Sequence, residues 1–96
     1  MNPKIWGPAG WKFLHSITLH YPDNPSQQDK QNYKHFFESL QFTIPCEKCQ
    51  KHYQENLQKY SLNNALKNKD TLFNWLVDIH NEVNAKNNKK VLSYVK

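Results

Sequence analysis

Two cysteines, Cys46 and Cys49, stand three residues apart and are the only ones in the chain. Thiols at positions i and i+3 of a helix share one face, and their Cα atoms then lie ~5–6 Å apart, within reach of a disulfide. Pro45 suits the first turn of a helix, where its missing N–H is not needed. This predicts Cys46 at or near the positive end of a helix, where the pKa of a thiol falls from ~8.5 toward ~4–7. The pair is therefore predicted to carry out dithiol–disulfide exchange.

Other uses of a cysteine pair were weighed against this chemistry. Haem attachment needs a histidine directly after the second cysteine, where this chain has Gln50. The flanking sequence supplies no βαβ pattern of the thioredoxin type. Two buried, inert cysteines remain an alternative, and so does zinc. A zinc site needs two more ligands, and no second close pair occurs among the histidines, which are His15, His20, His35, His52 and His80. We therefore expect redox chemistry and no metal.

Composition bounds the class of protein. A chain of 96 residues with 38% hydrophobic and 14% aromatic residues predicts one folded domain. No apolar run approaches the ~18 residues of a membrane span, and the N-terminus does not resemble a signal peptide. The formal charge of +5 comes from lysine without arginine. Because phosphate clamping and base readout favour arginine, nucleic acid is not the expected partner.

Hydrophobic periodicity of 3.6 residues predicts two helices before the cysteines. Gly7 and Pro8 are interpreted as the N-cap and first residue of a helix that ends at the turn 21–25. Ser26 is predicted to cap a second helix, which is broken at 43–45. The stripes are Trp11, Leu14, His15 and Thr18 in the first helix, and Tyr33, Phe36, Phe37 and Leu40 in the second.

The second half of the chain predicts further helices. The cysteine helix continues toward Tyr60, with both thiols on the side that packs inward, and a short helix or turn follows at 61–66. A fourth long helix is predicted to begin at Asp70 or Thr71 and to stop at 87–90, before a short tail at 91–95. Four amphipathic helices with short connections predict an all-α four-helix bundle.

Polar residues fall within the predicted apolar stripes. His15 and His80 lie in stripes of long helices, and Asn81 and Asn84 lie on faces that lean inward. A lone histidine in such a stripe is usually a core residue with one satisfied hydrogen bond. Four polar groups need more partners than a small bundle offers, so we expect a bound polar ligand to supply them.

These residues resemble the Erv/ALR-type flavin-linked sulfhydryl oxidases over nearly the whole chain. Each motif is weak alone, but together, in the family's order and approximate spacing, they are highly specific. The motifs are Trp6-Gly7-Pro8, Trp11, Leu14-His15, Tyr21-Pro22, Pro45-Cys46-Glu47-Lys48-Cys49, Trp75, His80-Asn81-Glu82-Val83-Asn84 and Lys89.

The resemblance implies a four-helix bundle with a short fifth helix that holds FAD at its mouth. It implies oxidation of two protein thiols by O₂, which gives a disulfide and hydrogen peroxide. Cys49 would be the flavin-proximal thiol, and Cys46 would be the exposed partner that exchanges with substrate. Lysines near the end of the fourth helix would neutralise the pyrophosphate. The residues implied for the FAD site are Trp6, Gly7, Trp11, His15, Cys49, His80, Asn81, Val83, Asn84, Lys86 and Lys89.

The resemblance also implies a homodimer packed through the first helices. The sequence supports a second partner for this helix, because it carries too many apolar side chains for one stripe. These are Ile5, Trp6, Phe13, Leu14, Ile17 and Leu19. A non-catalytic helical dimerisation or adaptor module is the alternative interpretation.

The chain departs from the family in several places. It lacks cysteines for the structural disulfide and the shuttle disulfide that many members carry, and Asn87 stands where the family usually has leucine. This minimal cysteine set resembles the members from large DNA viruses. We expect residues 1–96 to form one FAD-binding domain, as a whole protein or as the core of a longer one. Its location would be cytoplasmic or virion-associated if the protein is viral.

Overall fold

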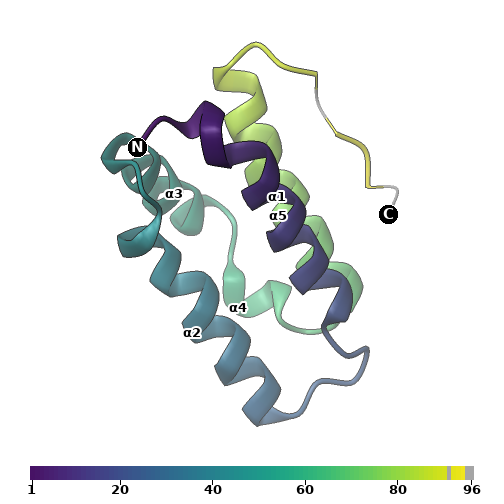
Figure 1. Cartoon of the computed structure of the whole chain (residues 1–96). Helices are drawn as coiled ribbons and strands as arrows, with labels where there is room; N and C mark the ends of the chain where they lie inside the picture. The colour runs from purple at the N-terminus through teal and green to yellow at the C-terminus, as the bar shows by residue number, and fades with distance from the viewer. Residues whose placement is uncertain (91, 95–96) are drawn as a thin grey trace.

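The computed structural model describes residues 1–90 and 92–94. In this part the chain forms four long helices and one short helix, which confirms the predicted all-α fold. Figure 1 shows α1 and α5 side by side, running in opposite directions. Helix α2 packs on α3, and α4 packs on α5. The helices are α1 (Pro3–His20), α2 (Gln27–Thr43), α3 (Glu47–Lys59), α4 (Leu62–Ala65) and α5 (Lys69–Lys86).

Helix α1 begins five residues before the predicted start, so the interpretation of Gly7 and Pro8 as N-cap and first residue was wrong. Asn2 is the N-cap, and its Oδ1 accepts a hydrogen bond from the Lys4 N–H at 3.0 Å. Pro3 then occupies the first helical position, where proline is favoured. Pro8 lies inside the helix. It is tolerated there near the N-terminus, at the loss of one backbone hydrogen bond.

The caps of α2 and α5 are reciprocal. Ser26 and Asp29 form the predicted capping box, in which each side chain accepts from the other residue's backbone N–H. Helix α5 begins slightly earlier than predicted, because Asn68 is its N-cap. Asn68 Oδ1 accepts from the Thr71 N–H at 2.9 Å, and Thr71 Oγ1 accepts from the Asn68 N–H at 3.0 Å. Thr71 is thus part of the cap and not the start of the helix.

Aromatic side chains with polar tips hold the core together. Tyr21 is fully buried, and its hydroxyl donates to the Leu66 carbonyl at 2.7 Å. The Trp75 indole N–H donates to the Tyr60 carbonyl at 3.0 Å and ties the end of α3 to α5. Each contact buries a large ring and satisfies its polar atom. The remaining core consists of Phe37, Tyr53, Leu62, Ala65, Leu66, Leu72, Leu76 and Ile79.

The predicted tail falls partly outside the described residues, because residues 91 and 95 are not among them. Within the described part, none of the helices has the length and apolar character needed to cross a bilayer.

Candidate functional site

The two cysteines form a disulfide with their Cα atoms 5.1 Å apart, which confirms the predicted reach. Helix α3 begins at Glu47, so Cys46 is its N-cap and Pro45 lies outside the helix, not in its first turn. The Cys49 N–H points at the Cys46 Sγ at 3.2 Å, and sulfur thereby takes the place of the usual capping oxygen. Both side chains are half-buried. The predicted position of Cys46 at the positive end of a helix is confirmed.

Besides the disulfide, the site contains three aromatic rings from α1 and α5 that lie in contact. The rings of Trp11 and His80 stack almost parallel, with centroids 3.8 Å apart and an interplanar angle of 7°. His15 Nε2 and His80 Nδ1 are 3.1 Å apart, a hydrogen bond whose donor depends on the tautomer. The structure therefore brings together three of the residues that the sequence assigned to the cofactor.

Burial keeps this histidine pair neutral. Desolvation, which is the largest cause, and the nearby charges of His15 and Lys89 together lower the pKa of His80 from 6.5 to about 4. Desolvation also lowers the pKa of His15. At neutral pH, one imidazole can then donate its single N–H to the other. The charge of Lys89 is the smallest of the three causes that lower the pKa of His80.

These polar residues have partners within the chain, contrary to the expectation that a bound ligand would have to supply them. The histidines bond to each other. The Asn81 side chain bonds the Leu92 backbone twice, donating from Nδ2 to the carbonyl at 3.0 Å and accepting at Oδ1 from the N–H at 2.7 Å. Asn84, which is buried, donates weakly to Asn81 at 3.5 Å. The tail supplies the partner of Asn81, and helical periodicity could not reveal it.

The end of α5 sets the position of Lys89. Asn88 adopts a left-handed φ of 56°. The Lys89 N–H donates to the Asn84 carbonyl at 2.8 Å, and the Asn88 N–H donates to the Ala85 carbonyl at 3.3 Å. These two bonds form a Schellman motif, which turns the chain back on the helix. The stop predicted at 87–90 is confirmed, and the turn fixes the backbone that carries the lysine.

The remaining residues assigned to the cofactor vary in exposure. Trp6, Gly7 and Val83 are half-buried, whereas Lys86 and Lys89 are exposed. Among the described residues, Trp6 Nε1 is the buried side-chain nitrogen or oxygen atom without a hydrogen-bond partner. An unpaired buried donor is costly, and an acceptor on a bound ligand would satisfy it.

These features fit a ligand that combines flat rings with a diphosphate. Half-buried Trp11 and His80 keep part of their surface exposed. Because they are in van der Waals contact with each other, a ring must stack on the outer side of the pair and not between its members. Lys89 can neutralise phosphate, and Trp6 offers a donor. In Figure 1, α3 begins at the same end of the bundle where α1 begins and α5 ends.

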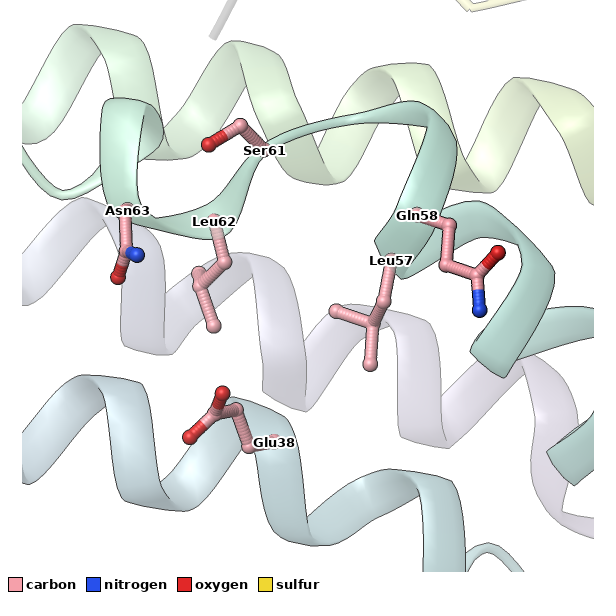
Figure 2. Close-up of a pocket in the computed structure, with 6 residues that line it drawn as sticks. All are labelled: Glu38, Leu57, Gln58, Ser61, Leu62 and Asn63. Atoms are coloured by element: carbon pink, nitrogen blue, oxygen red, sulfur yellow. The ribbon is translucent and has the colours of Figure 1, made fainter.

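Two hollows lie elsewhere on the molecule. One of about 290 Å³ opens between α2, the end of α3 and α4, and Figure 2 shows Glu38 of α2 rising toward Leu57 and Leu62. The other, of about 210 Å³, lies between α2 and α4 beside Lys30 and Lys34. None of the residues assigned to the cofactor lines either hollow. Neither hollow is therefore part of the candidate site.

Comparisons with known proteins agree on one family. The profile described as the Erv1 / Alr family matches residues 8–95. A protein described as a probable FAD-linked sulfhydryl oxidase of Acanthamoeba polyphaga mimivirus is 43% identical over 95 residues, which are 98% of this chain and 66% of the relative. A relative from Invertebrate iridescent virus 3 is 33% identical over 93 residues, 97% of this chain and 63% of that protein. The chain thus spans less than two thirds of each relative.

The fold is also found among solved structures. The FAD binding domain of Erv1 from Saccharomyces cerevisiae superposes with a TM-score of 0.91 at 26% sequence identity. The match covers 98% of this chain and 88% of the yeast one. This likeness and the profile cover both the cysteine helix and the two helices that carry the aromatic and histidine cluster.

Proposed function

The chain belongs to the Erv1 / Alr family, and on that premise we propose that it is an FAD-linked sulfhydryl oxidase. The reaction would convert two substrate thiols and O₂ into a disulfide and hydrogen peroxide. The observation that carries the proposal is the disulfide between Cys46 and Cys49 at the N-terminus of α3, in the family fold.

Cys46, the N-cap of α3, is proposed to be the residue that meets substrate. A substrate thiolate would attack Cys46 Sγ, the bond to Cys49 would break, and Cys49 would leave as a thiolate. A second substrate thiolate would then attack the substrate sulfur of this mixed disulfide and release Cys46 as a thiolate. The substrate leaves oxidised with a new S–S bond, and the protein keeps the electron pair on two thiolates, which take up the two protons lost by the substrate thiols to become thiols.

FAD, when bound, supplies the electron acceptor for the reduced pair and passes two electrons to O₂. We propose that Trp11 and His80 stack on its rings, that Trp6 Nε1 donates to it, and that Lys89 neutralises its phosphates. Gly7, His15, Asn81, Val83, Asn84 and Lys86 complete the proposed site. Cys49 would be the thiol nearer the cofactor.

The test uses protein purified with its flavin. We expect flavin absorbance, O₂ consumption with a dithiol, and one hydrogen peroxide per disulfide. Cys46→Ser and Cys49→Ser should each lower turnover by about a hundredfold or more while keeping the flavin bound, because serine cannot exchange. A protein without flavin, or serine variants that turn over at the parental rate, would refute the proposal.

The same variants test which cysteine has which role. Cys46→Ser leaves the Cys49 thiolate beside the flavin, and a broad long-wavelength charge-transfer band is expected in this variant. Cys49→Ser should lack the band. A band confined to Cys49→Ser would reverse the assignment of the two cysteines.

We further propose protein dithiols as substrates and a homodimer that packs through α1. Ile5 and Phe13 of α1 support the dimer, since 69% and 65% of their surface is exposed. Ile17 does not support it, because it packs against the core of its own chain. Within this proposal, residues 1–96 act as one FAD-binding domain.

A further inference from the structure

Two glutamines of α3 bind the open carbonyl end of α2. Gln50 Nε2 donates to the Ile44 carbonyl at 2.7 Å and, more weakly, to the Phe42 carbonyl at 3.4 Å. Gln54 Nε2, one turn further along α3, donates to the Gln41 carbonyl at 3.3 Å. The last carbonyls of a helix have no partners within it, so these side chains satisfy the Gln41 and Phe42 carbonyls, which would otherwise need water.

Gln50 also makes hydrogen bonds to the backbone around Cys46. Its backbone N–H donates to the Cys46 carbonyl at 2.9 Å. The Ile44 carbonyl that accepts from its side chain accepts from the Cys46 N–H as well, at 2.7 Å. Gln50 therefore bonds the Cys46 carbonyl directly, and it shares with the Cys46 N–H the Ile44 carbonyl as acceptor. Gln50 itself is half-buried, so water competes only partly for these bonds.

We propose that Gln50 is a positioning residue that keeps the reduced Cys46 sulfur at the N-terminus of α3. This inference rests on the proposed thiol oxidase function. In the oxidised protein, the bond to Cys49 already restrains Cys46. Once that bond is reduced, the restraint is lost, and the hydrogen bonds of Gln50 keep Cys46 Sγ aimed at the Cys49 N–H.

This position matters most when the substrate departs. In that step the new substrate S–S bond forms, the bond between substrate and Cys46 breaks, and Cys46 takes the electron pair. A thiol whose thiolate is stabilised leaves faster. The helix N-terminus and the Cys49 N–H provide that stabilisation only if Cys46 stays in the cap position. Glu47 and Lys48, the charged residues next in the chain, are exposed and stay unchanged in the test.

The experiment measures thiol reactivity in the flavin-containing protein, reduced under argon. Iodoacetamide labelling of Cys46 is followed against pH, and trypsin then separates the cysteines, because it cuts after Lys48 and leaves Cys46 in the peptide 35–48. In Gln50→Ala we expect the titration midpoint of Cys46 to rise. A rise of about half a unit lowers labelling about threefold at a pH below both midpoints, since only the thiolate reacts.

Matched variants separate positioning from stability. Gln54→Ala removes the neighbouring hydrogen bond to the Gln41 carbonyl, and Gln58→Ala changes an exposed glutamine of the same helix. Both should leave the midpoint unchanged, even if Gln54→Ala lowers the melting temperature. Gln50→Met keeps the approximate length, removes the donor and adds no charge, so it should raise the midpoint as Gln50→Ala does.

An unchanged midpoint in both Gln50 variants, or an equal rise in Gln54→Ala, would overturn the inference. The measurement needs no turnover with O₂. Failure of the oxidase proposal would therefore be seen in the O₂ assay and not in this titration.

Discussion

His15 Nε2 lies 3.1 Å from His80 Nδ1, and this bond joins α1 to α5 across 65 residues of sequence. The same His80 ring stacks on Trp11, so one imidazole contacts two side chains of α1. The arrangement favours a neutral His80, because a positive charge on this ring would be partly desolvated and would be repelled by Lys89. The histidine pair thus couples the proposed cofactor surface to the pH.

We predict that the protein loses stability as the pH falls from about 6.5 to about 4. In this window the unfolded chain binds a proton at His80 that the folded chain does not, since the pKa is 6.5 without the fold and about 4 within it. The stability that the folded chain gains from keeping His80 neutral is fully present above pH 6.5. The full shift would correspond to ~3 kcal/mol, and partial exposure reduces our expectation to ~1–2 kcal/mol.

Urea unfolding at pH 7 and pH 4.5 measures this loss. His80→Gln should flatten the dependence, whereas His35→Gln, which changes an exposed histidine of α2, should leave it as steep as in the parent. If His80→Gln retains the full slope, other groups are responsible.

Trp11→Leu tests the stacking surface. Leucine keeps an apolar side chain in α1 but loses the flat ring that faces His80. An aromatic pair is worth ~0.5–1.5 kcal/mol, so FAD affinity should fall about threefold to tenfold. Fluorescence titration of flavin-free protein with FAD measures it. The control is Phe36→Leu, which replaces an aromatic residue of α2. An equal loss of FAD affinity in this variant would show a general effect on the fold.

Asn81 offers a test of the tail. Asn81→Ala removes both hydrogen bonds to the Leu92 backbone, a loss of ~1–2 kcal/mol for a partly exposed pair. Trypsin should then cut after Lys89 and Lys90 several times faster, while Asn74→Ala, also in α5, should have no such effect. If FAD affinity falls without faster cleavage, Asn81 acts on the cofactor directly and not through the tail.

Local signals predicted the fold well. Ser26 and Asp29 formed the capping box that their spacing indicated. The start of α1 was misplaced because Asn2-Pro3 and Gly7-Pro8 both resemble a helix start, and periodicity could not choose between them. Asn2 is the N-cap because its side chain accepts a hydrogen bond from the Lys4 N–H, and glycine has no side chain that could do so.

The site was only partly predictable. The spacing of Cys46 and Cys49 predicted that a disulfide could join them, and the stripes placed His15 and His80 inward. Their mutual hydrogen bond depends on how α1 packs on α5. Gln50 was considered only as a missing haem ligand. Its binding of the Ile44 carbonyl depends on how α3 packs on α2, which no pattern in the sequence reports.

The final prediction concerns assembly through α1. Phe13 is 65% exposed on a helix whose other side packs on α5, and a large apolar side chain in that position is expected to meet a second copy. Phe13→Glu should convert the dimer to monomers without unfolding the chain. Phe42 of α2 is 71% exposed and lies outside α1, so Phe42→Glu is a matched control that should remain dimeric.

Sedimentation equilibrium at tens of micromolar protein decides the question. Because an apolar interface does not depend on charge pairs, the dimer should persist at ~1 M salt, where the screening length falls to ~3 Å. A monomer mass for the unmodified protein would refute the dimer. Dissociation of both glutamate variants would extend the interface to α2, since Phe42 would then have to face the second copy as well.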